Sequence, residues 1–533
     1  MGNVNLKYKP RKEQLEILDF FSDSVKSGKK FITIDAPTGI GKSYAIMMMI
    51  QWFLDNKDPN AKFDILTNTK LLQTQYIKDF PFLNSLKGKE NYYCRQHKCS
   101  CDEGQEINKY FGEDEAEDEV PLFPACKACP YKMDLMNFLG NTIALTNFHL
   151  YCSFIMYVPT LLEDRKAKIL FIDEAHSFDD IISEFLASEI SYNSLKSIFS
   201  DVKEDYVNDM VKRIKTIGDY AKILSQEIIP ALEKELQTLQ ANIKSENEMS
   251  RKTSLIKRYK LLDRSMCKYN RILKYGNGNW VFEKGKDYVK VEPLWSYTYL
   301  KSFIWDMYDH VVCLSGTILD KDLFAFLMGF DTRKMSYMQL QSPFERKNRM
   351  IFYHKNVGKL SYDEIDKNIG KALKQIAEIL EKNKGKKGII HTGNYKISNL
   401  IKEAFEDDRL LIHGPENREL MYEEHLNSTT DTVLVSPSML NGVDLKDDLS
   451  RFQVIVKVPY PSLMNQKTKL RMKVRPSWYS WKALGNFIQG YGRSIRNYDD
   501  YAETHVTDGC LDTLLKFNNK IIPNYIKEAI EKV

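Results

Sequence analysis

A glycine-rich segment near the start of the sequence has the residue types of a phosphate-binding loop. It follows an apolar run and precedes an amphipathic stretch. Its glycines let the backbone approach phosphate oxygens, and the first N–H groups of a following helix point at them. Lys42 can neutralise phosphate charge, and Ser43 can ligate Mg²⁺. The alternative is an ordinary strand–turn–helix. The candidate nucleotide-contacting residues are Ala36, Pro37, Thr38, Gly39, Ile40, Gly41, Lys42 and Ser43.

An acidic pair follows a second apolar run. Asp173 and Glu174 stand at the end of the segment 169–173 (ILFID). A carboxylate at a strand tip can hold a metal ion, so we expect Asp173 to bind the same Mg²⁺ as Ser43, and Glu174 can orient an attacking water. Acidic pairs after strands are common by chance. Their order and distance after the glycine-rich segment favour a functional role here.

A third group of candidate residues lies near the C-terminus, in the segment 489–496 (QGYGRSIR). If this segment is helical, Gln489, Arg493 and Arg496 fall at positions i, i+4 and i+7, on one face. Two guanidinium groups on one face suit a γ-phosphate approached from a second domain. The alternative is a solvated basic helix face, and this segment alone does not decide between the two.

The cysteines are unevenly distributed. Five of the nine lie within residues 94–129, which predicts a metal site because no secretory signal precedes them to favour disulfides. Zinc is one possibility, since Cys94 and Cys99 with four residues between them, and Cys126 and Cys129 with two between them, have acceptable spacing. The alternative is reduced cysteines without metal. The clustered cysteines are Cys94, Cys99, Cys101, Cys126 and Cys129; the scattered ones, expected to be buried apolar residues, are Cys152, Cys267, Cys313 and Cys510.

Short continuous apolar runs that alternate with amphipathic stretches must position these residues. Such runs suit strands that are buried on both faces of a parallel sheet, so the sequence predicts an α/β fold with doubly wound sheets. Three runs precede residue 320 and three follow residue 385, which predicts two α/β domains. The predicted strands are 31–35, 169–173, 311–315, 388–392, 432–436 and 454–458, and two of the amphipathic stretches are 43–54 and 362–381.

Two segments interrupt this alternation. Residues 88–130 carry the cysteine cluster and an acidic run, 113–119, which we expect to be a solvated loop. Residues 180–290 look helical, with two heptad-type seams that predict an antiparallel helix hairpin joined by a polar stretch of about eleven residues. The seams are Ile229, Leu232, Leu236, Leu239 and Ile243, and then Leu255, Tyr259, Leu262, Met266, Tyr269 and Leu273.

Composition sets broad limits. The chain has 533 residues, is 43% hydrophobic and 28% charged, and has a formal net charge of +5. These values exclude a wholly disordered or fibrous chain and are compatible with a polyanionic partner. No apolar run reaches the roughly 18 residues of a membrane span, and the first ten residues contain no apolar signal core. We therefore expect an intracellular, cytoplasmic or nucleoid-associated protein without a membrane partner.

Together these motifs resemble superfamily 2 helicases of the XPD/DinG type, over nearly the whole length of the chain. Residues 36–43 are similar to motif I, and Asp173-Glu-Ala-His176 to the DEAH box of motif II. Residues 489–496 are similar to motif VI. The other matching segments are 8–11 with Gln14 (adenine contact), 67–75 (motif Ia), 86–94 (start of an iron–sulfur insertion), 315–317 (motif III) and Asn441-Gly-Val-Asp444 (motif V).

The resemblance implies two RecA-like doubly wound parallel-sheet domains with a cysteine-cluster insertion and a helical arch insertion. The expected boundaries are 1–87, 131–179 and 291–335 for helicase domain 1, 88–130 for the iron–sulfur insertion, 180–290 for the arch and 336–533 for helicase domain 2. The expected catalytic residues are Lys42, Asp173, Glu174, His176, Gln489, Arg493 and Arg496, and Gln14 and Asp444 join the nucleotide contacts.

The resemblance also implies cofactors and an activity. The expected cofactors are ATP, Mg²⁺ and a [4Fe–4S] cluster held by Cys94, Cys101, Cys126 and Cys129, with Cys99 as an alternative to Cys101 and zinc as an alternative to iron–sulfur. The expected activity is ATP-dependent 5′→3′ translocation on single-stranded DNA by a monomer, with unwinding of forked DNA. The alternatives are an ATP-switched clamp that binds DNA or protein without unwinding, and an RNA helicase.

Two departures from the family pattern affect the second domain. The expected motif IV, near residues 391–395, has unusual residues, and motif V has Asn441 where the family typically has Glu. Both lie away from the predicted hydrolysis chemistry. They leave the expected nucleic-acid contacts of the second domain less defined than the ATP site.

Overall fold

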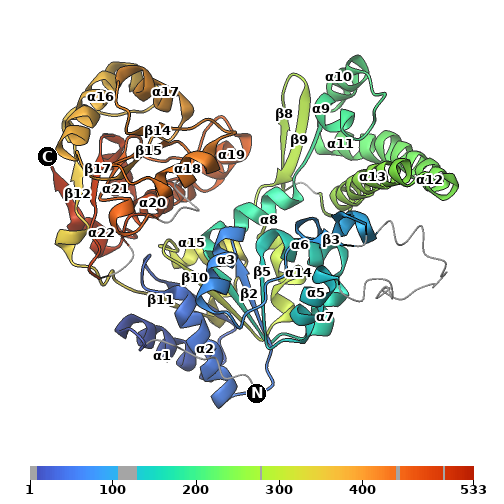
Figure 1. The fold of residues 1–533 in the computed structure, drawn as a ribbon, viewed down its shortest axis with the longest axis horizontal. Helices are drawn as coiled ribbons and strands as arrows, with labels where there is room; N and C mark the ends of the chain where they lie inside the picture. The colour runs from blue at the N-terminus through green and yellow to red at the C-terminus, as the bar shows by residue number, and fades with distance from the viewer. Residues whose placement is uncertain (1–8, 96, 106–128, 277–278, 440–444, 496–497) are drawn as a thin grey trace.

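The computed structural model describes residues 9–95, 97–105, 129–276, 279–439, 445–495 and 498–533. Within these residues the chain forms two parallel β-sheets, each with helices on both faces, and a helical protrusion from the first (Figure 1). The predicted α/β fold with two parallel sheets is therefore confirmed. The described residues contain no helix that is both long and apolar enough to cross a membrane.

The first sheet contains both the glycine-rich segment and the acidic pair. Each of its strands runs parallel to its neighbours, and all five residues of each of β1, β2, β5 and β6 are buried. For β1 and β6 this burial agrees with their continuous apolar runs. In spatial order the strands are β11 (Met335–Gln339), β1 (Phe31–Asp35), β10 (His310–Ser315), β6 (Ile169–Asp173), β2 (Phe63–Thr67) and β5 (Ile143–Asn147).

Helices cover both faces of the first sheet, and on each face the side chains of helices and strands pack into one apolar core. One face is covered by α1 (Lys12–Lys26), α2 (Lys42–Asn56) and α3 (Lys70–Asp79). The other is covered by α5 (Pro130–Gly140), α6 (Phe148–Tyr157), α7 (Pro159–Arg165), α8 (Phe178–Leu186), α14 (Tyr297–Phe303) and α15 (Lys321–Met328).

The second sheet has the same parallel design. In spatial order its strands are β14 (Leu410–Ile412), β15 (Val433–Ser436), β13 (Gly388–His391), β16 (Phe452–Ile455), β17 (Glu503–Val506), β12 (Ile351–Tyr353) and β18 (Ile530–Lys532). Its helices are α16 (Ile365–Lys382) and α17 (Tyr395–Ala404) on one face, and α18 (Arg418–Asn427), α20 (Pro476–Tyr491), α21 (Cys510–Phe517) and α22 (Asn524–Ala529) on the other; α19 (Gln466–Val474) precedes α20.

The connection between the two sheets lies later in the sequence than predicted. The predicted boundary at residues 335 and 336 falls at the start of β11, which pairs with β1 of the first sheet. The boundary therefore moves to residues 340–350. The strand escaped prediction because it is a half-exposed edge strand whose sequence, MSYMQ, gives no continuous apolar run. Below, "second-sheet unit" means residues 351–533.

Residues 180–290 form the protrusion, here called the arch. The predicted hairpin is α12 (Ile229–Ser245) packed on α13 (Met249–Tyr275), with a link of residues 246–248 that is shorter than the predicted one because both helices extend beyond their seams. The prediction that this segment is helical is incomplete. Its base is an antiparallel sheet of β7 (Ser188–Ser191), β9 (Tyr288–Pro293) and β8 (Trp280–Lys284). Its other helices are α9 (Tyr192–Lys196), α10 (Glu204–Arg213) and α11 (Ile217–Ile223), followed by a π-helical turn, Leu224–Ile228.

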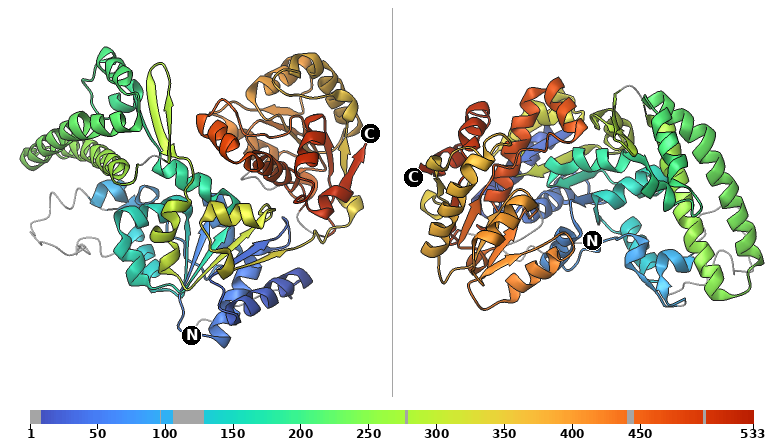
Figure 2. Two further views of the ribbon diagram at one scale, coloured as in Figure 1. Left: turned by 180° about the vertical axis from the view of Figure 1, so that it is seen from behind. Right: turned by 90° about the horizontal axis from the view of Figure 1, so that it is seen from above.

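The first described part of the cysteine segment, residues 88–95 and 97–105, lies against the arch (Figure 2). Its short strands β3 (Tyr93–Cys94) and β4 (Cys99–Ser100) pair in antiparallel fashion. Asp102 forms ion pairs with Lys260 (3.0 Å) and Arg264 (2.7 Å) of α13. The acidic run at 113–119 lies outside the described residues. Charge complementarity thus joins the two segments that interrupt the sheets.

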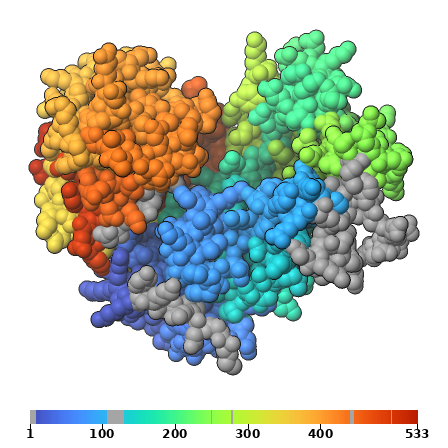
Figure 3. Space-filling view, in the orientation of Figure 1, coloured from blue at the N-terminus to red at the C-terminus, as the bar shows by residue number. Residues whose placement is uncertain are grey.

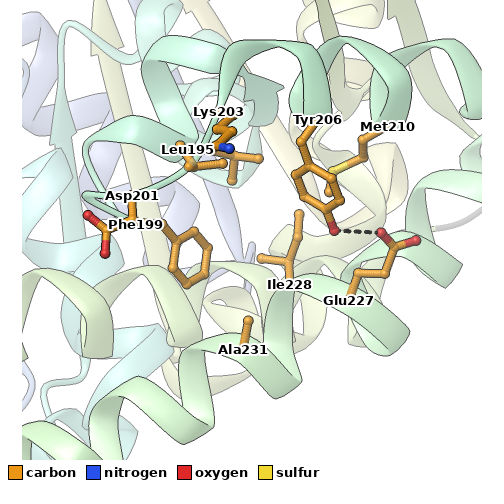
Figure 4. Close-up of a pocket in the computed structure, with 10 residues that line it drawn as sticks. Leu195, Phe199, Asp201, Lys203, Tyr206, Met210, Glu227, Ile228 and Ala231 are labelled. Atoms are coloured by element: carbon orange, nitrogen blue, oxygen red, sulfur yellow. Dashed lines mark hydrogen bonds between the residues drawn. The ribbon is translucent and has the colours of Figure 1, made fainter.

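The arch also contains an open pocket of about 410 Å³ between α9, α10 and the π-helical turn (Figure 4). Apolar side chains form most of its wall, and Tyr206 at its mouth donates a hydrogen bond to Glu227 (3.0 Å). None of the predicted nucleotide-contacting residues lines it. This pocket is therefore separate from the candidate site described next.

Candidate active site

The glycine-rich segment forms a loop between β1 and the N-terminus of α2. Gly39 and Gly41 adopt left-handed backbone conformations with φ of 83° and 85°, which disfavour residues with a Cβ. Lys42 begins the 15-residue helix α2, so the free N–H groups of its first turn face the loop. This is the geometry of an anion-binding helix terminus.

Two side chains from the start of α1 fix the loop backbone. Gln14 donates hydrogen bonds to the carbonyls of Ile40 (3.0 Å) and Gly41 (3.3 Å), and Arg11 donates one to the carbonyl of Gly39 (2.7 Å). In this arrangement Gln14 stabilises the loop. Its adenine contact, implied by the family resemblance, stays a prediction.

The acidic pair lies opposite the loop at the end of β6. Glu174 Oε1 is 3.4 Å from Lys42 Nζ, and Tyr76 donates a 2.8 Å hydrogen bond to Asp173. Glu174 adopts a left-handed backbone conformation with φ of 57°, which is uncommon outside glycine and typical of strained functional positions. Tyr76 was missed in the sequence, although it directly follows the segment 67–75 that resembles motif Ia.

The two carboxyl groups have opposite pKa shifts. Burial, together with the charge of Glu174, raises the pKa of Asp173 to about 6. Burial would also raise the pKa of Glu174, but Lys42, His176 and Arg493 outweigh it and hold this pKa well below its usual range. Glu174 is therefore firmly ionised, and part of the positive charge that ionises it comes from the second-sheet unit.

A continuous polar chain joins the acidic pair to the second-sheet unit. His176 Nδ1 lies 2.9 Å from Ser315 Oγ and 3.3 Å from Glu174 Oε2. Ser315 Oγ lies 3.3 Å from Thr317 Oγ1, which accepts a 3.0 Å hydrogen bond from Gln489. Gln489 in turn accepts a 2.9 Å hydrogen bond from Arg493. Segments that are far apart in sequence thus meet in one network, called the interdomain network below; its residues are Lys42, Glu174, His176, Ser315, Thr317, Gln489 and Arg493.

The helix predicted over residues 489–496 is wrong at Arg493, because α20 ends at Tyr491. Gly492 then lies so close to the loop that a Cβ there would be 2.4 Å from Thr38 Oγ1. Two glycines weaken the helix, and the close packing on Thr38 sets the direction of the chain that follows. Arg493 therefore reaches the site from a turn and not from a helix face. Arg496 and Asp444 lie outside the described residues.

A buried carboxylate holds the segment that resembles motif III. Asp35 accepts hydrogen bonds from the backbone N–H groups of Ile318 (3.2 Å) and Leu319 (2.9 Å) and from the Gln339 side chain (2.9 Å). Its pKa is raised by burial, against these hydrogen bonds. The sequence offered one signal for this role, an Asp at the end of the apolar run FITID.

Four of the five clustered cysteines are described, and they lie close together. Cys94 and Cys99 face each other across the β3–β4 pair, and the sulfur atoms of Cys101 and Cys129 are 3.5 Å apart. Burial raises the pKa of Cys99 to about 11 and that of Cys101 to about 12. Cys126 lies outside the described residues, and the described part of the chain alone contains no group of three or more side chains arranged to hold a metal ion.

Two family models match the sequence. One for a helicase C-terminal domain matches residues 371–528, and one for the res subunit of type III restriction enzymes matches residues 7–207. "Probable ATP-dependent helicase MJ0942" of Methanocaldococcus jannaschii is 21% identical, over 94% of this chain and 91% of the relative. "ATP-dependent DNA helicase YoaA" of Haemophilus influenzae is 20% identical, over 95% of this chain and 91% of the relative.

Two solved structures, "XPD_Helicase" and "Structure of S. tokodaii Xpd4", are similar in fold. The first has a TM-score of 0.62 and 16% identity, over 98% of this chain and 100% of that chain. The second has a TM-score of 0.57 and 13% identity, over the same shares. At these identities the structural likeness shows the fold, and it agrees with the fold expected from the sequence motifs.

Proposed function

Because the chain is a superfamily 2 helicase of the XPD/DinG type, we propose that it is a monomeric DNA helicase that moves 5′→3′ along single-stranded DNA and unwinds forked duplexes. The energy would come from ATP hydrolysis between the two sheets. The observation that carries this proposal is the interdomain network, which joins the glycine-rich loop and the acidic pair to Arg493. A site shared by two sheets changes when they move apart, which is what a translocating motor requires.

The roles in hydrolysis follow from chemistry and position. Lys42 and the N–H groups at the start of α2 bind the β- and γ-phosphates. Ser43 and Asp173 supply oxygen ligands of the kind that Mg²⁺ prefers, and the ion neutralises phosphate charge when it is bound. Asp173 suits this role because its carboxylate is buried and oriented by Tyr76.

Glu174 acts as the group that orients and deprotonates the attacking water. Its present ion pair with Lys42 gives way when phosphate becomes the partner of Lys42, and this frees the carboxylate for water. Arg493 stabilises the charge of the transferring phosphoryl group from the second-sheet unit, with Arg496 as a second candidate. His176 and Gln489 orient the catalytic groups through Ser315 and Thr317.

We also propose that the cysteine segment holds a [4Fe–4S] cluster through Cys94, Cys101, Cys126 and Cys129. The contact between the sulfur atoms of Cys101 and Cys129, with Cys94 nearby, supports a thiolate-rich centre. Cys99 is the alternative to Cys101, and zinc is the alternative metal. Burial raises the pKa of the Cys101 thiol, so this ligand would release its proton when the metal binds, and the cluster would stabilise this segment.

A strand-displacement assay tests the proposed activity. ATP hydrolysis should be stimulated by single-stranded DNA, and a duplex with a 5′ tail should be unwound while one with a 3′ tail is not. Unwinding of only the 3′-tailed duplex would overturn the polarity. Unwinding of RNA but not DNA would make the chain an RNA helicase. Stimulated hydrolysis without displacement of any substrate would identify an ATP-switched clamp.

Anaerobic purification tests the metal. An iron–sulfur protein should be brown, with broad absorbance near ~400 nm and iron by elemental analysis. Cys129→Ser should lose the colour and reduce unwinding far more than basal ATP hydrolysis. The matched control is Cys152→Ser, which removes a buried cysteine outside the cluster. A colourless, zinc-loaded protein would show that the metal is zinc.

A further inference from the structure

The second-sheet unit makes another polar contact with the rest of the molecule, away from the nucleotide loop. Arg471 of α19 has a side chain only 1% exposed and lies 2.9 Å from Asp179 and 3.2 Å from Asp180, both in α8. Lys482 of α20 lies 2.6 Å from Asp180. Lys467 of α19 lies 3.3 Å from Glu292 of β9. We call these six residues the Arg471 cluster.

Aromatic side chains enclose the Arg471 cluster. The guanidinium carbon of Arg471 lies 4.6 Å from the ring centre of Trp295, two residues after β9, and 5.0 Å from that of Trp478, in α20. The two indole rings contact each other edge to face across the interface, with centres 6.1 Å apart. Such an enclosed cation costs desolvation energy that its partners only partly return. Glu292 also pairs with Lys290 of the same strand (3.0 Å), so the anions of the cluster have a further cation beside them. These enclosed contacts are better suited to fixing one geometry than to adding stability.

The acidic partners occupy a particular place in the chain. Asp179 and Asp180 follow the acidic pair Asp173 and Glu174 after one turn of 3₁₀-helix, Ala175–Ser177, that leads directly into α8. The second-sheet unit therefore connects to both ends of residues 173–180: Arg493 reaches Glu174 through the interdomain network, and Arg471 binds Asp179 and Asp180.

Helix α8 connects these contacts to the arch. It ends at Leu186, and β7 of the arch base begins at Ser188. Asp179 also accepts a 2.6 Å hydrogen bond from Ser296, and Ser183 donates one to the carbonyl of Pro293 (3.0 Å), so α8 is bound to the strand that returns from the arch. Figure 3 shows a notch between the second-sheet unit and the β8–β9 hairpin of the arch, and the Arg471 cluster joins the two sides at the level of α8 and β9.

We propose that the Arg471 cluster positions α8 and the arch base against the second-sheet unit, so that movement of this unit during the ATP cycle is delivered to the arch. Its residues are positioning residues that set how much unwinding each hydrolysis produces, and not how fast ATP is hydrolysed. The proposal rests on the proposed helicase function. A contact that served adhesion alone would affect stability, and it would leave the ratio of unwinding to hydrolysis unchanged.

The test uses Lys482→Gln and Asp180→Asn, singly and together. The first removes the pair of Lys482 with Asp180, and the second removes that pair and the pair of Arg471 with Asp180. The matched control is Lys473→Gln, which removes the same charge from an exposed position on α19. We expect base pairs unwound per ATP to fall about tenfold in each cluster variant, with DNA-stimulated hydrolysis within about twofold of the parent protein. The double variant should lose little more than Asp180→Asn alone, because Asp180→Asn already removes the pair that Lys482→Gln removes.

A second readout does not depend on unwinding. Fluorophores introduced at Lys286, at the tip of the β8–β9 hairpin, and at Tyr362, which is 92% exposed on the second-sheet unit, report their separation by energy transfer. A non-hydrolysable ATP analogue should change the transfer efficiency in the parent protein and in Lys473→Gln, and much less in the cluster variants.

The outcomes separate this proposal from the proposed function. Equal losses of hydrolysis and unwinding in the cluster variants, or no loss of either, would overturn the coupling role. If the parent protein hydrolyses ATP but unwinds nothing, the helicase proposal fails. The energy-transfer measurement alone then tests whether the Arg471 cluster couples the arch to the second-sheet unit. A change in transfer efficiency that is lost in the cluster variants would support this coupling. An equal change in the parent protein and all variants would exclude the coupling.

Discussion

The two parallel sheets share an architecture and differ in the chemistry at their edges. The first provides the anion-binding loop, Lys42 and the carboxylates Asp173 and Glu174. The second approaches that edge with a hydrogen-bonded pair, Gln489 and Arg493. The negative charge of the site belongs to one sheet, and the cation that lowers the pKa of Glu174 from outside belongs to the other.

This difference teaches that neither sheet alone contains a complete site. Charge stabilisation is strongest where water is excluded, and here exclusion depends on contact between the two sheets. Gly492 against Thr38 and Gln489 against Thr317 are such contacts. Substitutions in the first sheet should therefore affect phosphate binding and hydrolysis directly. Substitutions in the second sheet should mainly affect the hydrolysis step, which takes place while the two sheets are in contact.

The largest effect is expected from Lys42→Ala, which removes the loop cation from the first sheet. ATP hydrolysis should fall by at least about a thousandfold, because the lysine stabilises the transferring phosphoryl group. Steady-state ATPase assays measure this, and circular dichroism checks the fold. The control is Lys57→Ala, at the exposed position directly after the same helix. Substantial DNA-stimulated hydrolysis by folded Lys42→Ala protein would contradict the assigned role.

Arg493→Ala tests the contribution of the second sheet. The maximal rate should fall about a thousandfold while nucleotide affinity changes little, because a cation supplied across the interface acts mainly in the transition state. Single-turnover kinetics and equilibrium binding of a fluorescent nucleotide separate the two. Arg493→Lys should recover little activity, since lysine lacks the forked geometry. Loss of affinity with an unchanged rate would make Arg493 an ordinary binding residue.

Glu174→Gln should preserve ATP binding and slow hydrolysis by about a hundredfold or more. The amide has the shape of the carboxylate and cannot accept a proton from water. Rapid-quench measurement of the chemical step gives the rate. Glu184→Gln, at an exposed position of α8, is the control. Near-normal turnover by Glu174→Gln would remove this residue from the mechanism.

Gly492→Ala tests the close contact between the two sheets at Gly492 and Thr38. The new Cβ would meet Thr38 Oγ1 at 2.4 Å, so the two edges must separate slightly, and we expect about a tenfold loss of kcat/KM. Thr38→Ala in the same protein should return part of the loss. Gly370→Ala is the control, because a Cβ there meets nothing within 4 Å. This substitution should stabilise α16 by about 0.5–1 kcal/mol and leave kcat/KM unchanged. Unchanged kinetics in Gly492→Ala would mean that this contact is not required.

The last difference between the two sheets concerns acid stability and not turnover. Burial lowers the pKa of three histidines of the second-sheet unit, His354 and His425 to about 4 and His391 to about 3, from 6.5. Because their folded-state pKa values are depressed, the folded state favours the neutral form, and stability is lost as pH falls below about 6.5. As the pH falls further, each histidine lowers the free energy of unfolding by about 1.4 kcal/mol per pH unit, until its folded-state pKa is reached.

Pulse proteolysis in urea at pH 7 and pH 5 measures this difference. Peptides from the second-sheet unit should be released at lower urea at pH 5, with a smaller shift for peptides from the first sheet. His391→Leu should reduce the pH dependence by removing one of the three groups. An equal acid shift in both regions, unchanged in His391→Leu, would contradict the assignment.

Local spacing was enough to predict the α/β fold, the loop and the acidic pair, because these signals lie within a few neighbouring residues. Continuous apolar runs marked β1 and β6 at their observed bounds. By contrast, β2 (FDILT) was missed because Asp64 interrupts its apolar run. That carboxylate is tolerated in the core by Arg165, 2.5 Å away and 101 positions later in the chain, which no local pattern reveals.

The sequence by itself therefore determined which residue types are available for phosphate and metal chemistry, and the kind of sheet that presents them. Only the tertiary structure decided how they meet. It ended α20 before Arg493, placed Gly492 against Thr38, paired Tyr76 with Asp173 and bound Asp179 and Asp180 to Arg471. The physical reason is that periodicity reports which side of an element is buried, whereas the partner on that side comes from a distant segment whose position is set by packing of the whole chain.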